Sequence, residues 1–253
     1  MAMSRWLAPV TALVIAITPL AAQERGGFFS NLFGGNDDEA EEDGGGWLER
    51  QLEDALSSEG SDVTIRGFAG VLSGAATVET ITISDADGVW LRLEDVVLDW
   101  NRSALLRRTL DVNELSAALV QLPRTPLPSD APDVPDAEAT HFSLPTLPVS
   151  VQIDRFAIER LELGQPVIGV ETVASAEGAM SLANGEGVVD IDLVRLDGEG
   201  ELILDASYSN ASEVLSIDLN LSEAEDGIFA ALVDLPGRPS VDLTVKGEAP
   251  IND

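Results

Sequence analysis

The residues of this chain that could do chemistry are carboxylates. Asp and Glu number 45 against 14 Lys and Arg, His141 is the one histidine, and there is no cysteine. A pair of carboxylates could hydrolyse a glycosidic bond, and a serine, His141 and an aspartate could form a hydrolytic triad. However, most of the acids lie in turns or on the polar side of strand patterns, where solvation accounts for them, and His141 lies in a proline-rich segment. We therefore expect no catalytic residue, no metal site, no cofactor and no enzymatic activity.

The strongest acidic run, residues 37–43, is not a convincing calcium site. Only Ala40 is uncharged in it, and it lacks the alternating ligands and the closing glutamate of a calcium loop. The Gly-Glu-Gly pieces at 185–187 and 198–200 lack the spacing and the basic residue of a phosphate loop. A net charge of −31 argues against nucleic acid as a partner and against electrostatic binding to anionic lipid. Membrane contact would have to be hydrophobic or be made by a partner.

The elements that would position a site begin with an export signal. Arg5 precedes an apolar run over residues 6–22 that contains Pro9 and Pro19 and ends in Ala-Ala-Gln. This pattern predicts a signal peptide over residues 1–22, and a signal anchor is the alternative. Both place the rest of the chain outside the cytoplasm. Residues 23–46, rich in glycine and acid, predict a flexible tether.

Residues 47–122 predict a short amphipathic helix followed by a β-sheet. Apolar residues in 47–56 have helical spacing, and from Val63 the period becomes two. A turn at residues 85–88 joins two strands, and the alternation changes phase near Asp95, which predicts a bulge or a break. A helical turn is expected at residues 103–108.

Residues 123–148 predict a proline-rich loop, and strands resume over residues 149–253. Turns are expected at 184–187 and 197–200, and residues 226–235 predict a helix with Asp226 as its N-cap. Because a strand pattern lies close to Asp253, we expect the chain to continue as a longer, repeat-like protein.

These patterns predict a mostly β protein with one apolar sheet face and few helices to cover it. An ordinary β-sandwich, in which two such faces cover each other, is the plain alternative. The hypothesis for the apolar positions is a lipid-binding groove in an elongated, curved antiparallel sheet, and for each position core packing is the alternative. The candidate groove residues are Val63, Ile65, Leu91, Leu93, Val151, Ile153, Leu202, Leu204, Ile217 and Leu219.

Four segments resemble a known family. They are WLERQL at 47–52, IRGFAGVLSG at 65–74, ITISDADGVWL at 81–91 and LDWNRSALL at 98–106. Together they resemble the N-terminal portion of the TamB family of AsmA-like proteins, which are similar in architecture to bridge-like lipid transfer proteins. The resemblance covers residues 47–122 best, and residues 150–164 less specifically.

The resemblance implies a β-trough on the periplasmic side of the inner membrane of a Gram-negative bacterium. It implies that the trough conducts phospholipid toward the outer membrane, with a TamA-like Omp85 protein as the outer-membrane partner and a role in outer-membrane protein and autotransporter assembly. The leader departs from the family, which usually has an anchor, and the family's long body and C-terminal domain are not matched here. The alternative function is an adaptor of β-sandwich fold that binds other envelope proteins and no lipid.

Overall fold

A computed structural model describes residues 53, 57, 61–70, 74–127, 142–145, 147 and 149–251. The predicted leader, the predicted tether and His141 lie outside the described residues. Of the predicted helix at 47–56 only Glu53 is described. It is helical, and the backbone N–H of Ser57 donates to its carbonyl oxygen at 2.8 Å.

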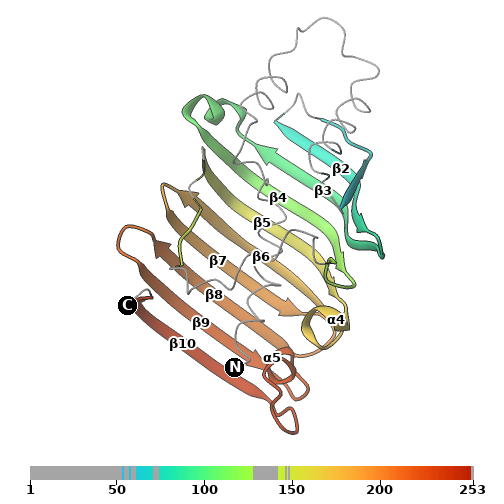
Figure 1. Ribbon diagram of the computed structural model, residues 1–253, viewed down its shortest axis with the longest axis vertical. Coiled ribbons are helices and arrows are strands. Elements are labelled where there is room, and N and C mark those ends of the chain that lie inside the picture. Colours follow the sequence, from blue (N-terminus) through green and yellow to red (C-terminus); the bar gives the residue numbers. More distant parts are fainter. Residues whose placement is uncertain are drawn as a thin grey trace, which may run out of the picture.

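All ten described strands belong to one sheet, in which they lie side by side in the order of the sequence (Figure 1). The sheet is not closed into a barrel, so β1 and β10 are its two edges. The mostly β composition predicted from the alternating pattern is therefore confirmed. The strands are β1 (Asp62–Arg66), β2 (Ala75–Asp85), β3 (Gly88–Trp100), β4 (Thr109–Leu122), β5 (Ser150–Leu163), β6 (Thr172–Ala183), β7 (Glu186–Arg195), β8 (Gly200–Ser209), β9 (Val214–Glu223) and β10 (Val241–Pro250).

One strand pair departs from the predicted antiparallel arrangement. β4 and β5 are parallel, with Thr109 opposite Ser150 and Leu122 opposite Leu163, whereas every other neighbouring pair is antiparallel. The sheet is therefore mixed. Parallel neighbours need a long crossover that brings the chain back to the end where the first strand began. The proline-rich segment between Leu122 and Ser150 makes this crossover.

The turn and break predictions are confirmed where the structure describes them. Asn184 and Gly185 both have positive φ in the tight turn between β6 and β7, as a hairpin of this kind requires. Asp95 has a φ of 49°, and it separates Leu93 from Val96, which lie on the same side of β3. β3 keeps the same register with β2 on both sides of Asp95, so the change of phase comes from the backbone conformation of this residue and not from an inserted residue.

In the described parts of the chain, three short helical elements lie between the strands. They are η2 (Arg102–Arg107), α4 (Gln165–Ile168) and α5 (Ile228–Leu232). The predicted helix at 226–235 is shorter than expected, and its predicted cap is wrong. Asp226 has a φ of 61°, which does not suit an N-cap, and Gly227 occupies that position.

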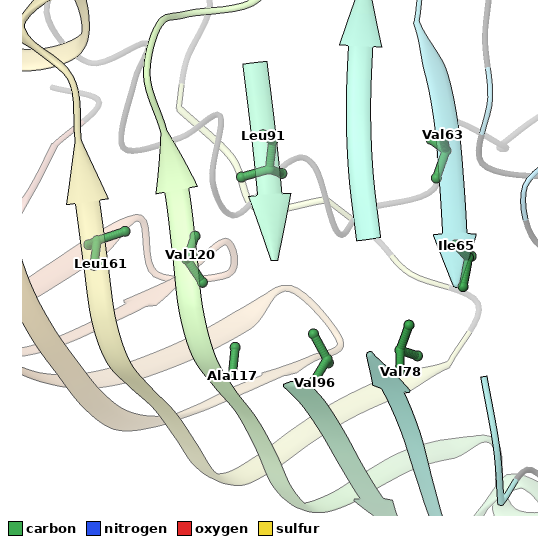
Figure 2. Close-up of a cluster of buried hydrophobic side chains, with 8 residues drawn as sticks. All are labelled: Val63, Ile65, Val78, Leu91, Val96, Ala117, Val120 and Leu161. Carbon is green, nitrogen blue, oxygen red and sulfur yellow. The ribbon is translucent and has the colours of Figure 1, made fainter. Parts of the chain in front are cut away.

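The buried core lies on one side of the sheet, over its first five strands. In Figure 2 the side chains of Val63 and Ile65 on β1 lie across the cluster from Leu161 on β5, and the other side chains lie between them. Phe68 and Trp90 pack against this cluster. The cluster consists of Val63, Ile65, Val78, Leu91, Val96, Ala117, Val120 and Leu161.

Candidate functional site

The strand register places all ten candidate groove residues on the same side of the sheet. Residues directly opposite each other in neighbouring strands share a face, and the printed pairs connect the candidates strand by strand. We call this side the apolar face. One of its rows crosses nine strands in continuous register and consists of Ala76, Leu98, Leu115, Phe156, Gly178, Ile191, Leu204, Leu219 and Val245.

The two halves of the apolar face differ in exposure. Val63, Ile65 and Leu91 are 8%, 5% and 5% exposed, and Ile153 is also buried. Leu93 and Val151 are half-buried. The candidates on β8 and β9, which are Leu202, Leu204, Ile217 and Leu219, are all half-buried, and Val245 on β10 is 40% exposed. The side chains of the second half of the face are thus the ones that remain accessible.

A short segment of the crossover lies over one end of this face. We call residues 142–145 and 147 the strap. The Tyr208 hydroxyl donates to the carbonyl oxygen of Phe142 at 2.8 Å, and the two rings meet edge to face at 4.8 Å. Asn210 accepts from the Leu144 N–H at 2.8 Å and donates to the Leu144 carbonyl at 2.9 Å. Leu144 itself lies over Gly187, where an added Cβ would be 2.8 Å from its Cδ1.

Glu223 organises the opposite end of the same face. It is the last residue of β9, is 6% exposed, and shares the apolar face with Leu219 and Leu221. Its two carboxylate oxygens accept from the N–H groups of Ile228 and Phe229 at 3.0 and 2.8 Å, so it takes the place of a side-chain cap for α5. Figure 1 shows α4 and α5 at this end of the strands.

The other side of the second half of the sheet is polar and strongly acidic. Asp190, Asp205, Asp218 and Lys246 lie directly opposite one another on β7, β8, β9 and β10. Lys246 is paired with Asp218 at 2.5 Å. A hydrogen bond to the Asp205 carboxyl, aided by burial and by the neighbouring negative charges, raises the pKa of Asp190 above its usual range. This face also exposes Val188, Val194 and Ile203, which are 54%, 43% and 37% exposed, so isolated apolar side chains lie among its carboxylates.

An ion pair fixes the start of the crossover. Arg124 donates to both carboxylate oxygens of Asp85, at 2.9 and 2.5 Å, and the Leu127 N–H donates to the same carboxylate at 2.9 Å. These hydrogen bonds hold the pKa of Asp85 well below its usual range. They tie the segment after β4 to the hairpin between β2 and β3.

The widest continuous surface among the described residues is the apolar face, which can make apolar contacts. Within them no three His, Cys, Asp or Glu side chains gather in a way that could hold a metal ion. None of the helices in this part of the chain has the length and hydropathy needed to cross a bilayer. The site that can be built from these residues is therefore the apolar face between the strap and α5.

Sequence reasoning missed several residues of this face. Phe156 and Met180 stand in the rows beside the predicted positions, and Tyr208 and Leu144 lie where the strap meets the sheet. The signal for the strap was available in the apolar residues Phe142, Leu144 and Leu147, which interrupt the prolines of the crossover.

Comparison with known proteins gives no relative, because no family model, curated protein or solved structure matches the chain.

Proposed function

We propose that the apolar face holds the acyl chains of phospholipids. On this proposal the protein is a TamB-like scaffold in a curved, trough-shaped sheet on the periplasmic side of the inner membrane, and it passes phospholipid toward the outer membrane. The observation that carries the proposal is the continuous apolar row from β2 to β10, of which the second half is only half-buried. The role in outer-membrane protein assembly and the TamA-like partner rest on the sequence resemblance.

The dimensions and energetics of the row suit an acyl chain. Neighbouring strands lie about 4.8 Å apart, so a row across nine strands is about 38 Å long. One leaflet of a bilayer has a hydrocarbon depth of about 15 Å, so a lipid tail lying across the strands fits within the row. Burial contributes about 0.8 kcal/mol per methylene without any specific polar contact, which suits a surface made of Leu, Ile and Val.

The alternative, an adaptor that binds proteins and no lipid, would use the same face differently. In a β-sandwich adaptor a second sheet would cover the apolar side chains. All ten described strands, however, belong to one sheet. This favours an apolar face that receives a ligand over one closed by a partner sheet.

The test compares two neighbouring positions on β8 that face opposite sides. Leu204 lies in the apolar row, and Ile203, which is 37% exposed, lies on the polar side opposite Asn220. We would express the full chain in a Gram-negative envelope, purify it, and measure bound phospholipid by native mass spectrometry and lipid extraction. Phospholipid should accompany the wild type and the Ile203→Glu variant, and it should be lost from Leu204→Glu.

Leu204 is chosen over Leu91 because Leu91 is 5% exposed, and a charge there would threaten the fold. Circular dichroism would establish that both β8 variants retain the sheet. Equal lipid content in Leu204→Glu and Ile203→Glu, or no lipid in the wild type, would contradict the proposal and favour the adaptor.

A further inference from the structure

The short helical element η2 concentrates positive charge in an acidic protein. Residues 100–110 contain Arg102, Arg107 and Arg108 and no acid, although the chain has only 14 Lys and Arg against 45 Asp and Glu. Leu106 in the same element is 90% exposed, the largest exposed fraction of any large hydrophobic side chain in the described residues. The overall charge of the chain opposes binding to anionic lipid, but this local surface has the opposite sign.

The base of η2 is fixed to the sheet. In Figure 1, η2 is the green coil at the end of the sheet where β3 leads into β4. Ala104 is 0% exposed, and its N–H donates to the Asn101 carbonyl oxygen at 3.0 Å. Asn101 is in turn held by Asp111 on β4, because its backbone N–H donates to the Asp111 carbonyl at 2.8 Å and its side-chain amide donates to the Asp111 carboxylate at 3.2 Å. A fixed base therefore presents the exposed Leu106 to its surroundings.

Two arginines of η2 differ in their partners from the arginines of the strands. Arg92, Arg155 and Arg160 each form an ion pair with a glutamate of the sheet. Within the part of the chain that the structure describes, neither Arg107 nor Arg108 forms such a pair, and both are exposed. Their charge can therefore meet an anionic group outside the protein.

The acidic row of the polar face lies away from η2. Its nearest member, Asp190 on β7, is three strands from β4 and thus at least about 14 Å from it. The screening length is about 8 Å at an ionic strength of about 0.15 M. The acids that flank η2 in the sequence, Asp99 and Asp111, each accept a hydrogen bond from an asparagine side chain. The repulsion from the acidic row is therefore largely screened where η2 would make contact.

We propose that η2 docks onto an anionic phospholipid surface, with Leu106 inserted at the interface and Arg107 and Arg108 against the lipid phosphates. Burial of an apolar side chain and attraction of basic side chains to anionic headgroups act together in elements that lie on a bilayer. A bilayer suits this element better than a protein partner does. A stable protein interface buries about 800 Å² on each side, which is far more than an element of 6 residues presents.

This docking would decide which end of the sheet lies next to the membrane. The Ser150 N–H donates to the Arg108 carbonyl oxygen at 2.9 Å, and Ser150 begins β5 shortly after the strap. The end of the sheet that carries η2 is therefore the end where the strap lies, and α4 and α5 lie at the other. The inference does not require that the apolar face holds lipid. Bound lipid, tested at Leu204, and surface contact, tested at Leu106, are separate measurements that can fail separately.

The chain has no cysteine, so a single introduced cysteine can carry one environment-sensitive fluorophore. The label would be placed at Leu106→Cys and, as the matched control, at Leu196→Cys. Leu196 is a 52% exposed leucine beside Asp197, at the other end of the sheet. The full chain would be mixed with vesicles of phosphatidylcholine alone or with about 30% phosphatidylglycerol. With the anionic vesicles the fluorescence at position 106 should shift to shorter wavelength, and the fluorescence at position 196 should not.

The label reports on its own position, so the result does not depend on whether another segment of the chain also binds the vesicles. No shift at position 106 overturns the proposal, and this is the result expected if the partner of η2 is an acidic protein. Equal shifts at both positions, or the same shift at position 106 with both kinds of vesicle, also overturn it.

The arginine contact is tested in the chain labelled at Leu106→Cys. Arg107→Gln should weaken binding of the labelled element to the anionic vesicles about fivefold, which is the contribution of one basic side chain near an anionic surface. Arg238→Gln is the matched control, because it removes the same charge from an exposed arginine between α5 and β10, at the other end of the sheet. Circular dichroism would establish that both variants fold. Equal weakening by both variants, or none by Arg107→Gln, contradicts the proposal.

Discussion

Phe156 of β5 lies over Gly178 of β6, directly opposite it in the sheet. A Cβ added to Gly178 would lie 2.9 Å from the Phe156 ring and 2.0 Å from the carbonyl oxygen of Asp190 on the other side. The glycine thus makes room for the one large aromatic ring in the row that crosses nine strands. This row is the surface on which the proposed lipid binding depends.

Gly178→Ala should therefore destabilise the protein even though alanine is small. The added methyl group must displace the Phe156 ring and the β7 backbone, and overpacking of this kind costs about 1–3 kcal/mol. Urea unfolding followed by circular dichroism would measure the loss. Gly247→Ala is the matched control, since a Cβ there meets nothing within 4 Å, and it should be neutral or slightly stabilising. Equal effects at the two sites would show that Phe156 does not depend on Gly178.

The strap should loosen when its anchor is removed. Asn210→Ala deletes both hydrogen bonds to Leu144, each worth about 0.5–1.5 kcal/mol, while the pairing of β8 with β9 is left in place. Amide hydrogen exchange should become faster at Leu144 and its neighbours and stay unchanged in β8. Asn113→Ala, which deletes an exposed bond to Asp99, serves as the control. Unchanged exchange in the strap of Asn210→Ala would mean that Phe142 and Tyr208 hold it unaided.

The alternation of the sequence was sufficient to predict the apolar face but not the route of the chain over it. Alternate residues of a strand face the same side, so the shared side of Leu202 and Leu204, or of Leu91 and Leu93, follows from the local pattern alone. The break at Asp95 was visible for the same reason, as a change in that pattern. The use of these residues in lipid binding stays a prediction.

The parallel pairing of β4 with β5 could not be predicted in this way. The two strands are parallel because β5 starts at the same end of the sheet as β4. The route of the chain to that end depends on contacts between residues distant in sequence, such as Arg124 with Asp85 and Asn210 with Leu144. The cap of α5 was wrong for a related reason. Asp226 has a suitable side chain, but Glu223 already accepts the first helical N–H groups from the end of β9.

The acidic row on the polar face should make the stability of the sheet depend on pH. The folded-state pKa of Asp190 is raised, mainly by its hydrogen bond with Asp205. Such a group contributes stability below its unfolded pKa of about 3.9, and this contribution is lost as the pH rises through the folded pKa. The negative charges of Asp205 and Asp192 disfavour the ionised form of Asp190.

Asp190→Asn should therefore be more stable than the wild type at pH 7, by about 0.2–1 kcal/mol for one like-charge pair. The difference should shrink as the pH falls through the raised pKa of Asp190 and should be smallest below about 3.9. Unfolding curves of both proteins across this range would check the sign. Glu201→Gln, which removes a charge from β8 outside the row, controls for the general relief of negative charge. A larger gain from Glu201→Gln would show that net charge, and not the pairing of Asp190 with Asp205, is responsible.

Asp85 should act in the opposite sense, because its pKa is lowered by the hydrogen bonds from Arg124. Its contribution to stability is present above its unfolded pKa of about 3.9 and is lost as the pH falls toward the folded value. The Asp85 side chain is 3% exposed. Asp85→Asn therefore leaves the partly buried Arg124 guanidinium without its charged partner. The variant should unfold at a lower urea concentration than the wild type at pH 7 and should lose less stability on acidification.

Asp87→Asn changes an acid in the same turn and should have the smaller effect, since the Asp87 contact to Asp85 is made by its backbone N–H. If the two variants behave alike, the ion pair does not anchor the crossover, and the attachment of the segment after β4 must come from its backbone contacts.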